Sequence, residues 1–124
     1  MKIVNSKKAP EPIGPYSHAV VVKNFVFVSG MIAIDPATGK MVNGGVKEQT
    51  EHALASLKAV LKAAGTSEKN VAKTTVFLKD ASTFKEMNEA YAKFFGKHKP
   101  ARATLVTGFP RDDILVEIEA VASR

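Results

Sequence analysis

The sequence predicts an α+β fold in which two helices pack on one face of a mixed β-sheet. Two segments carry apolar residues at three- and four-residue spacing, which is the periodicity of an amphipathic helix. Several shorter runs are rich in Val, Ile and Phe and are bounded by turn-forming residues, which indicates strands. Their order is β-β-α-β-α-β-β, so we expect residues 1–124 to form a single α+β domain.

Two strands are predicted near the N-terminus, over Ala19–Val22 and Phe25–Ser29, because both runs are β-branched or aromatic. Lys23 and Asn24 lie between them as a two-residue turn, in which we expect Asn24 to accept a positive φ. The preceding segment Ala9–Pro15 is rich in proline, which predicts a rigid, non-helical stretch.

A turn is predicted over Asp35–Gly39, where proline comes early and glycine late. A short additional strand near Lys40 is an open alternative. The first helix is predicted over Val46–Ala64 from its apolar periodicity, and Gly65 is expected to end it.

The second half of the chain predicts a strand over Val71–Leu78 and a helix over Phe84–Phe95. Thr83 and Glu86 have the spacing of a capping box at the start of this helix, and Gly96 is expected to end it. Strands at Arg102–Val106 and Ile114–Ala122 complete the chain.

The last predicted strand has two different faces. Val116, Ile118, Ala120 and Ala122 alternate with a second set that mixes apolar and acidic groups, namely Leu115, Glu117, Glu119 and Val121. The first set is expected to face the helices. No third helix is predicted that could cover the other face, and an uncovered face with apolar groups usually meets another subunit. We therefore expect a homo-oligomer.

The composition narrows the possible functions. The chain has no cysteine, which excludes disulfides, thiolate metal sites and a Cys nucleophile. The net charge of +6 is compatible with nucleic-acid binding, but the lysines are scattered among acidic residues. Their tightest cluster, Lys93, Lys97, His98 and Lys99, is expected to complement a helix end, with phosphate binding as the alternative.

No secretory signal and no apolar run near the roughly 20 residues of a membrane span are visible. We therefore expect a cytoplasmic protein. The histidines show no metal-ligand spacing with acidic residues, and neither a metal nor an organic cofactor is expected.

Arg102 is the first candidate for binding chemistry. It begins a strand and is one of only three arginines, Arg102, Arg111 and Arg124, in a chain whose other basic residues are lysines. Its planar guanidinium could hold a carboxylate through two parallel hydrogen bonds. The alternative interpretation is a salt bridge across the sheet to Glu117 or Glu119.

Glu117 and Glu119 share one face of a strand, where one of them could position a water molecule or both could belong to a solvated or interface-paired face. Pro15 would present Tyr16 rigidly, so that its hydroxyl could donate to a ligand or to a backbone carbonyl. Gly30 would let a ligand approach the backbone closely at the end of a strand. Asn88 lies beside an apolar helix stripe and could point into a pocket or bond a loop.

Together these segments resemble the RidA/YjgF family, also called L-PSP. The resemblance extends over almost the whole chain, and the order of the motifs makes it specific. The matching stretches are Ala9–Ala19 (APEPIGPYSHA), Phe25–Ile32 (FVFVSGMI), Gly39–Gly65, Val71–Asp80 (VAKTTVFLKD), Met87–Gly96 (MNEAYAKFFG), Lys99–Thr104 (KPARAT) and Val116–Ala122 (VEIEAVA).

The resemblance implies a chorismate-mutase-like fold, assembled as a homotrimer with sites between subunits. It implies hydrolysis of imines or enamines of short 2-amino acids, such as 2-iminopropanoate and 2-iminobutanoate, to 2-oxo acids and ammonia. By position, the family's carboxylate-binding arginine falls on Arg102, its tyrosine on Tyr16 and its water-positioning glutamate on Glu117. The remaining family positions, which would contact substrate, fall on Ser29, Gly30 and Asn88.

The chain departs from the common family pattern at positions expected to border the pocket. Thr104 stands where cysteine is frequent and would lie beside the attacking water and the substrate. Met31 replaces a usual glutamine, and His18 replaces another. These differences leave the preferred substrate open.

Two other functions stay as alternatives to the imine deaminase. The first is an endoribonuclease or translation inhibitor, a description the family has also carried; no aromatic-rich basic stripe supports it. The second is a non-catalytic binder of small carboxylates or a chaperone-like trimer, in which Arg102 would matter and Glu117 would not.

Overall fold

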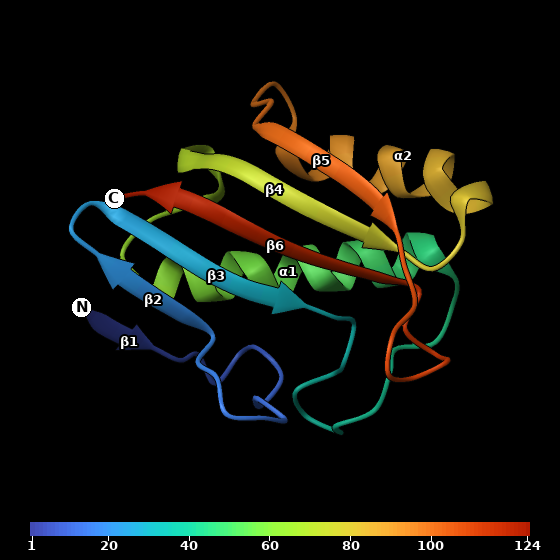
Figure 1. Cartoon of the computed structure of the whole chain (residues 1–124), viewed down its shortest axis with the longest axis horizontal. Coiled ribbons are helices and arrows are strands. Elements are labelled where there is room, and N and C mark those ends of the chain that lie inside the picture. Colours follow the sequence, from blue (N-terminus) through green and yellow to red (C-terminus); the bar gives the residue numbers. More distant parts are fainter.

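The computed structural model describes residues 1–124 and contains one six-stranded sheet (Figure 1). The strand order across the sheet is β1-β2-β3-β6-β4-β5. Only β4 and β5 are parallel, and every other neighbouring pair is antiparallel, so the sheet is mixed as predicted. The strands are β1 (Lys2–Val4), β2 (Ala19–Val22), β3 (Phe25–Met31), β4 (Val71–Leu78), β5 (Ala101–Val106) and β6 (Val116–Ser123).

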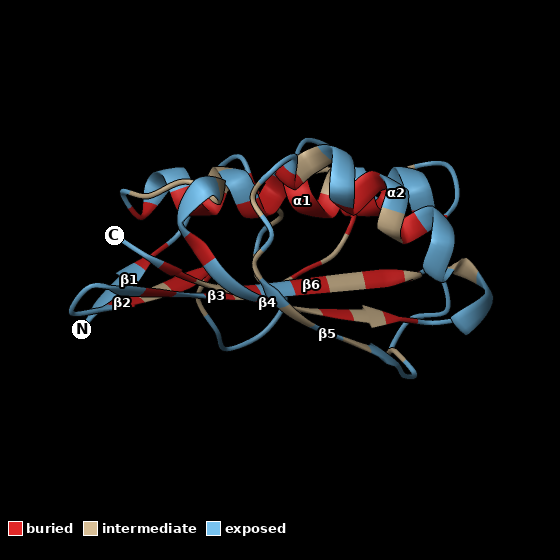
Figure 2. Ribbon diagram, turned by 90° about the horizontal axis from the view of Figure 1, so that it is seen from above, coloured by how far each residue is buried: buried red, intermediate tan, exposed pale blue.

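Two helices, α1 (Val46–Ala63) and α2 (Phe84–Phe95), lie on the same side of the sheet (Figure 2). The short 3₁₀ helices η1 (Glu68–Asn70) and η2 (Ala81–Thr83) precede β4 and α2. The predicted arrangement of two helices on one face of the sheet is therefore confirmed. No helix is long and apolar enough to cross a membrane.

The core lies between the helices and one face of the sheet. In β6, Val116, Ile118, Ala120 and Ala122 are buried, whereas the residues between them are half-buried or exposed, which confirms the predicted alternation. Leu54, Leu57 and Leu61 of α1 are completely buried against this layer. Burial of side chains of this size contributes about 1.5–3 kcal/mol each, before the entropic cost of folding is subtracted.

Helix α1 ends at glycine, as predicted. Gly65 has φ +83°, and its N–H donates to the Lys62 carbonyl while the Thr66 N–H donates to the Leu61 carbonyl. This pair of bonds is a Schellman motif, which needs a left-handed residue that glycine adopts without steric cost.

Several local predictions were incomplete. The three-residue strand β1 was not predicted, because three residues are too few to show an alternating pattern. The additional strand near Lys40 is only an isolated bridge between Ile34 and Met41. Strand β6 begins at Val116, two residues later than predicted, because Ile114 and Leu115 belong to the preceding loop.

The predicted turn joins β2 to β3, but the positive φ falls on Lys23, at 52°, and not on Asn24. Both favoured types of two-residue hairpin turn require positive φ at their first central residue, which is Lys23.

The predicted capping box at α2 is not formed. The Thr83 hydroxyl donates to the Asp80 carbonyl at 2.7 Å and makes no bond to the first turn of the helix. Thr83 is the last residue of η2, whose own cap is the Asp80 carboxylate, so its hydroxyl is used within that preceding turn.

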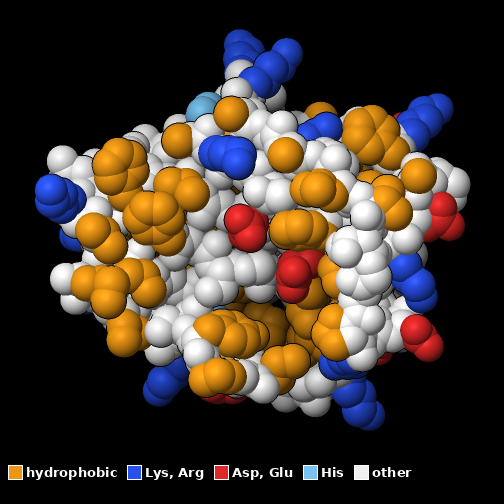
Figure 3. Space-filling model, in the orientation of Figure 1, with side chains coloured by type: hydrophobic (Ala, Val, Ile, Leu, Met, Phe, Trp, Pro, Cys, Tyr) orange, Lys and Arg blue, Asp and Glu red, His pale blue; other side chains and the backbone are white.

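The face of the sheet away from the helices is uncovered (Figures 2 and 3). Hydrophobic side chains are spread over it, with acidic groups near its middle. Ile3, Phe25, Phe27 and Leu105 are between 46% and 62% exposed, although such side chains are usually buried. The uncovered apolar face expected from the sequence is therefore present.

Candidate active site

An irregularity in β3 brings Gly30 against Glu117. The register between β3 and β6 shifts between Val28 and Met31, so Ser29 and Gly30 form a bulge at the end of the strand. A Cβ atom on Gly30 would lie 2.7 Å from Cδ of Glu117 and 2.9 Å from its Cγ. Glycine is needed here because the Glu117 side chain lies against the Gly30 backbone. Bulges commonly redirect groups beside active sites.

The Glu117 carboxyl is half-buried and makes no hydrogen bond or ion pair within the chain. Burial raises the pKa of Glu117, and the negative charge of Glu119 on the same strand face raises that pKa further. A carboxyl with a raised pKa exchanges protons closer to neutral pH, which suits a general acid or base.

Tyr16 lies beside this bulge with a free hydroxyl. Its ring is 48% exposed, and the hydroxyl bonds no group of the chain, so the interpretation in which it donates to a backbone carbonyl is wrong. The Tyr16 N–H donates to the Gly14 carbonyl at 2.9 Å, which forms a tight turn around Pro15.

Ser29 connects this loop to β3. Its hydroxyl donates to the Ser17 carbonyl at 2.6 Å, and its N–H donates to the His18 carbonyl at 2.9 Å. The hydroxyl proton is therefore used within the chain, and only the oxygen lone pairs remain for a ligand.

A cavity of about 180 Å³ adjoins Tyr16 and Gly30. Figure 3 shows the hollowed part of this face, edged by hydrophobic side chains. Its apolar wall includes Ile13, Met31, Ile32, Ile34 and Pro36, and its charged residues are Glu11, Asp35 and Arg111. The cavity is thus mostly apolar with a few polar groups, as small-molecule sites usually are.

Arg102 lies on the opposite face of the sheet from Glu117. Its backbone pairs with Thr74, which is buried beneath the helices. The guanidinium lies over the Tyr91 ring, 4.7 Å from its centroid, and 5.8 Å from the centroid of Phe84. Arg102 forms no ion pair, so the interpretation as a salt bridge to Glu117 or Glu119 is wrong. Alternate residues of a strand face opposite ways, which separates these groups.

Asn88 and Arg102 line a second cavity, of about 260 Å³, at the C-terminal end of α2. Tyr91 also lines this cavity, and its hydroxyl lies 2.7 Å from the Thr74 hydroxyl. Burial raises the pKa of Tyr91, so the phenol stays neutral beneath the guanidinium. Aromatic faces attract a cation without neutralising it, which leaves the outer edge of Arg102 available to an anion. Thr104 is half-buried on the same face of β5 but lines neither cavity.

The structure therefore divides the candidate residues into two groups. Tyr16, Ser29, Gly30 and Glu117 lie together at the open face, whereas Arg102 and Asn88 lie on the helix side beside the edge strand β5. One copy of the chain does not bring the two groups into a common site.

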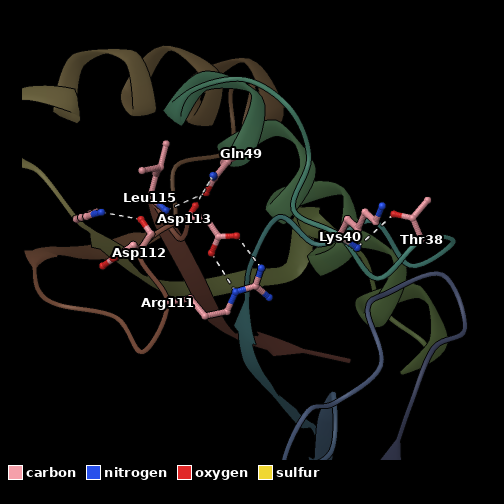
Figure 4. Close-up of polar contacts among 8 residues, drawn as sticks. Thr38, Lys40, Gln49, Arg111, Asp112, Asp113 and Leu115 are labelled. Carbon is pink, nitrogen blue, oxygen red and sulfur yellow. Dashed lines mark hydrogen bonds and ion pairs between the residues drawn. The ribbon is translucent and has the colours of Figure 1, made fainter.

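Arg111 lines the first cavity but was not singled out in the sequence (Figure 4). Its guanidinium donates two hydrogen bonds to the Asp113 carboxylate, at 3.0 and 2.7 Å, which lower the pKa of Asp113. The only signal in the sequence was the run Arg111-Asp112-Asp113.

The loop that carries Arg111 is held by two side chains from outside it (Figure 4). The buried Gln49 amide of α1 donates to the Asp113 carbonyl at 2.8 Å and accepts from the Leu115 N–H at 2.9 Å. Lys79 donates to the Asp112 carbonyl at 2.6 Å. Gln49 therefore fixes the loop from within the core.

Comparison with known proteins identifies the family. The family model described as endoribonuclease L-PSP matches residues 6–124. A RutC family protein of Pyrococcus abyssi is 48% identical over 121 residues, covering 98% of this chain and 95% of the relative. The human protein named 2-iminobutanoate/2-iminopropanoate deaminase is 44% identical over 122 residues, covering 98% of this chain and 88% of the human protein.

The fold agrees with this assignment. The crystal structure of Escherichia coli TdcF with bound serine has a TM-score of 0.94 and 37% identity, covering 100% of this chain and 99% of TdcF. The chain therefore belongs to the RidA/YjgF family, to which the L-PSP family model corresponds.

Proposed function

We propose that this protein hydrolyses reactive 2-imino acids, such as 2-iminobutanoate and 2-iminopropanoate, to 2-oxo acids and ammonia. The observation that carries the proposal is the unpaired Glu117 carboxyl, which lies against Gly30 and has a raised pKa. The free hydroxyl of Tyr16 on the neighbouring loop adds to it. The name of the human relative supports the substrate class.

We further propose that the working unit is a homotrimer with sites between subunits. Arg102 and Asn88 of one subunit would complete the site formed by Tyr16, Gly30 and Glu117 of the next. The apolar uncovered face and the position of Arg102 on the edge strand β5 support this arrangement. The two groups lie on opposite faces of one sheet, so a second copy is the direct way to join them.

Substrate binding in this site would rest on charge. Arg102 holds the substrate carboxylate through two parallel hydrogen bonds, while the rings of Tyr91 and Phe84 hold its guanidinium in position. The Gly30 N–H and the Tyr16 hydroxyl donate further hydrogen bonds to the substrate. Asn88 and Thr104 border the arginine and contribute to the shape of the site.

Hydrolysis then needs one water molecule and one proton carrier. Glu117 accepts a proton from the water as the water oxygen bonds to the imine carbon, and it returns that proton to the nitrogen. Glu117 then takes the hydroxyl proton of the tetrahedral intermediate and delivers it to the amino group, so the carbon–nitrogen bond breaks and ammonia leaves as the carbonyl forms. One imine and one water thus give one 2-oxo acid and one ammonia. Oriented binding together with general-base help lowers the barrier by several kcal/mol.

The test is a coupled assay in which an amino-acid oxidase generates the imine and release of 2-oxo acid is followed. We expect Arg102→Ala and Glu117→Gln each to lower kcat/KM at least about a hundredfold, in the range of lost acid–base help. Arg124→Ala is the matched control, because it removes an arginine that lines neither cavity. Full activity in both site variants would refute the proposal.

The same variants, tested in a ligand titration, distinguish the imine deaminase from the non-catalytic alternative. A protein that only binds small carboxylates would lose ligand affinity in Arg102→Ala and keep its properties in Glu117→Gln. The structure of TdcF with bound serine makes serine a suitable ligand for that titration.

The description of the family model keeps RNA cleavage as the second candidate. RNA hydrolysis commonly uses free imidazoles as acid and base. Here both ring nitrogens of His18 bond backbone groups, and Nε2 of His98 bonds the Val71 carbonyl at 2.7 Å. His52 alone makes no ring hydrogen bond, so the chain offers one free imidazole and no acid–base pair of them. Cleavage that persists through repurification and disappears in Glu117→Gln would favour this candidate.

A further inference from the structure

His18 bonds three other segments of the chain from one buried position. Only 3% of its surface is exposed. Its backbone N–H donates to the Asn5 side chain at 2.9 Å, and its carbonyl accepts from the Ser29 N–H at 2.9 Å. Its ring accepts from the Ser6 N–H at Nδ1, at 3.0 Å, and bonds the Pro10 carbonyl through Nε2, at 2.6 Å.

These bonds define the state of the imidazole. A backbone N–H can only donate and a carbonyl can only accept, so Nδ1 is bare and Nε2 carries the hydrogen. The folded arrangement therefore requires the neutral ring. Protonation would place a second N–H on Nδ1, pointing at the Ser6 N–H, and the two donors would repel each other.

The bonded segments surround the loop that carries Tyr16. Ser6 and Pro10 lie before the loop, and Tyr16 lies two residues before His18. The Ser29 hydroxyl closes the other side by bonding the Ser17 carbonyl. His18 and Tyr16 also line the same cavity. If the His18 ring lost its two hydrogen bonds, the loop that forms this part of the cavity wall could move.

We infer that His18 is a positioning residue that holds the Tyr16 loop in its working place while its ring is neutral and releases it on protonation. The inference rests on the proposed function, because Tyr16 is one of the groups assigned to substrate binding. It makes the activity of this chain acid-sensitive through a group that has no part in the proposed binding and hydrolysis steps.

No charged side chain bonds the His18 ring, so its response to protonation depends on its two backbone partners. Glu11, Tyr16, Asp35 and Arg111 line the cavity with His18, and none of them bonds the ring. Lys7 and Lys8 follow Ser6 and are exposed, and β3 carries no charged side chain. The groups that directly contact the imidazole nitrogens are thus uncharged.

Glutamine at this position offers a matched variant. A primary amide carries an acceptor oxygen and a donor NH₂ on one carbon, so His18→Gln can accept from the Ser6 N–H and donate to the Pro10 carbonyl. It reproduces both bonds and cannot titrate. His18→Leu has a similar apolar bulk and makes neither bond.

The experiment measures kcat/KM for imine hydrolysis from pH 8 to pH 5.5 in the wild type, His18→Gln and His18→Leu. We expect His18→Gln to retain most of the wild-type activity at pH 8, and His18→Leu to lose it. Towards pH 5.5 the wild type should lose several-fold more activity than His18→Gln, because only the wild-type ring can add a proton at Nδ1. Superimposable pH profiles of the wild type and His18→Gln would overturn the inference.

A second readout does not depend on activity. Amide hydrogen exchange at Ser6, expressed as a protection factor, should decrease at acid pH in the wild type and stay level in His18→Gln. Loss of Ser6 protection at acid pH in a protein that hydrolyses no imine would support the role of His18 in holding the loop and refute the proposed deaminase function. Unchanged Ser6 protection in the wild type at pH 5.5 would overturn the role of His18 itself.

Discussion

At the scale of single residues, Gly30 and Glu117 depend on each other. The carboxyl reaches its position because Gly30 has no side chain, and it remains unpaired because no donor of the same chain lies within hydrogen-bonding distance. An unpaired half-buried carboxyl costs folding free energy unless a proton or a ligand compensates it. Such a cost is common where a residue serves function rather than stability.

Gly30→Ala should therefore be more harmful to activity than to folding. The new Cβ would meet the Glu117 side chain at 2.7 Å and displace it, because a side chain moves more easily than a strand. We expect a loss of about 1–3 kcal/mol in stability, as for other overpacked sites. We also expect kcat/KM to fall about as far as in Glu117→Gln. Gly108→Ala is the control, since a Cβ there meets no atom. Wild-type activity in Gly30→Ala would contradict the contact.

The raised pKa of Glu117 predicts how stability depends on pH. A carboxyl whose folded pKa exceeds its unfolded value stabilises the fold at pH values below the unfolded pKa, near 4.3, and that contribution is lost as the pH rises through the folded pKa. Glu117→Gln should thus be more stable than the wild type at pH 7, and the difference should vanish at acid pH. Denaturant titrations at pH 7 and pH 4 measure this, and a wild type that is the more stable at pH 7 would count against the shift.

At the scale of elements, helix α1 positions the site through one buried amide. Gln49 bonds the backbone of the loop before β6 at two points, so the helix and the loop form one unit. The loop carries Arg111 into the cavity, and β6 carries Glu117 directly after it. A change in α1 can therefore reach the site without any contact to a ligand.

Gln49→Leu should cost about 1–3 kcal/mol, because it leaves the Asp113 carbonyl and the Leu115 N–H without partners. The loop should also become more mobile, with amide exchange at Leu115 as the local measurement. Glu51→Ala, an exposed change on the same helix, should alter stability by less than about 0.5 kcal/mol. Equal stability of the two variants would show that the amide does not hold the loop.

At the scale of the whole molecule, two layers leave one face of the sheet open. Helices α1 and α2 cover only one side, and the other side exposes Phe25, Phe27 and Leu105 around the acidic groups of β6 (Figures 2 and 3). The two groups of candidate residues lie on opposite sides of this sheet. Assembly would cover the apolar face and would join the two groups in a single step.

Phe27→Glu should therefore dissociate the assembly. It places a charge on the apolar face, beside Val121 of β6, where desolvation would oppose association. Sedimentation should show the wild type as an oligomer at micromolar concentration and the variant as a smaller species with little imine hydrolysis. Ala55→Glu adds the same charge on the exposed side of α1 and should stay assembled. A wild-type monomer with full activity would refute the shared site.

Sequence patterns predicted most of the elements, because each pattern depends on local periodicity. The helix over Phe84–Phe95 and the strand over Val71–Leu78 match the predicted bounds. Strand β1 escaped prediction because three residues carry no period, and the cap at Thr83 failed because a preceding turn competed for its hydroxyl. The candidate residues were named from their types and the family resemblance. Gln49 was missed because its partners are backbone groups of a distant loop, and Arg111 was missed because only the folded chain brings it to the cavity.

The sequence by itself determined the α+β class, the two helices, the alternation of the last strand and the family. These depend on neighbours a few positions apart, which a sequence displays directly. Only the tertiary structure decided that Arg102 and Glu117 face opposite ways, that Glu117 is unpaired against Gly30 and that the His18 ring bonds Ser6 and Pro10. Each of these depends on strand register and on hydrogen bonds between segments far apart in the chain, and no local pattern encodes them.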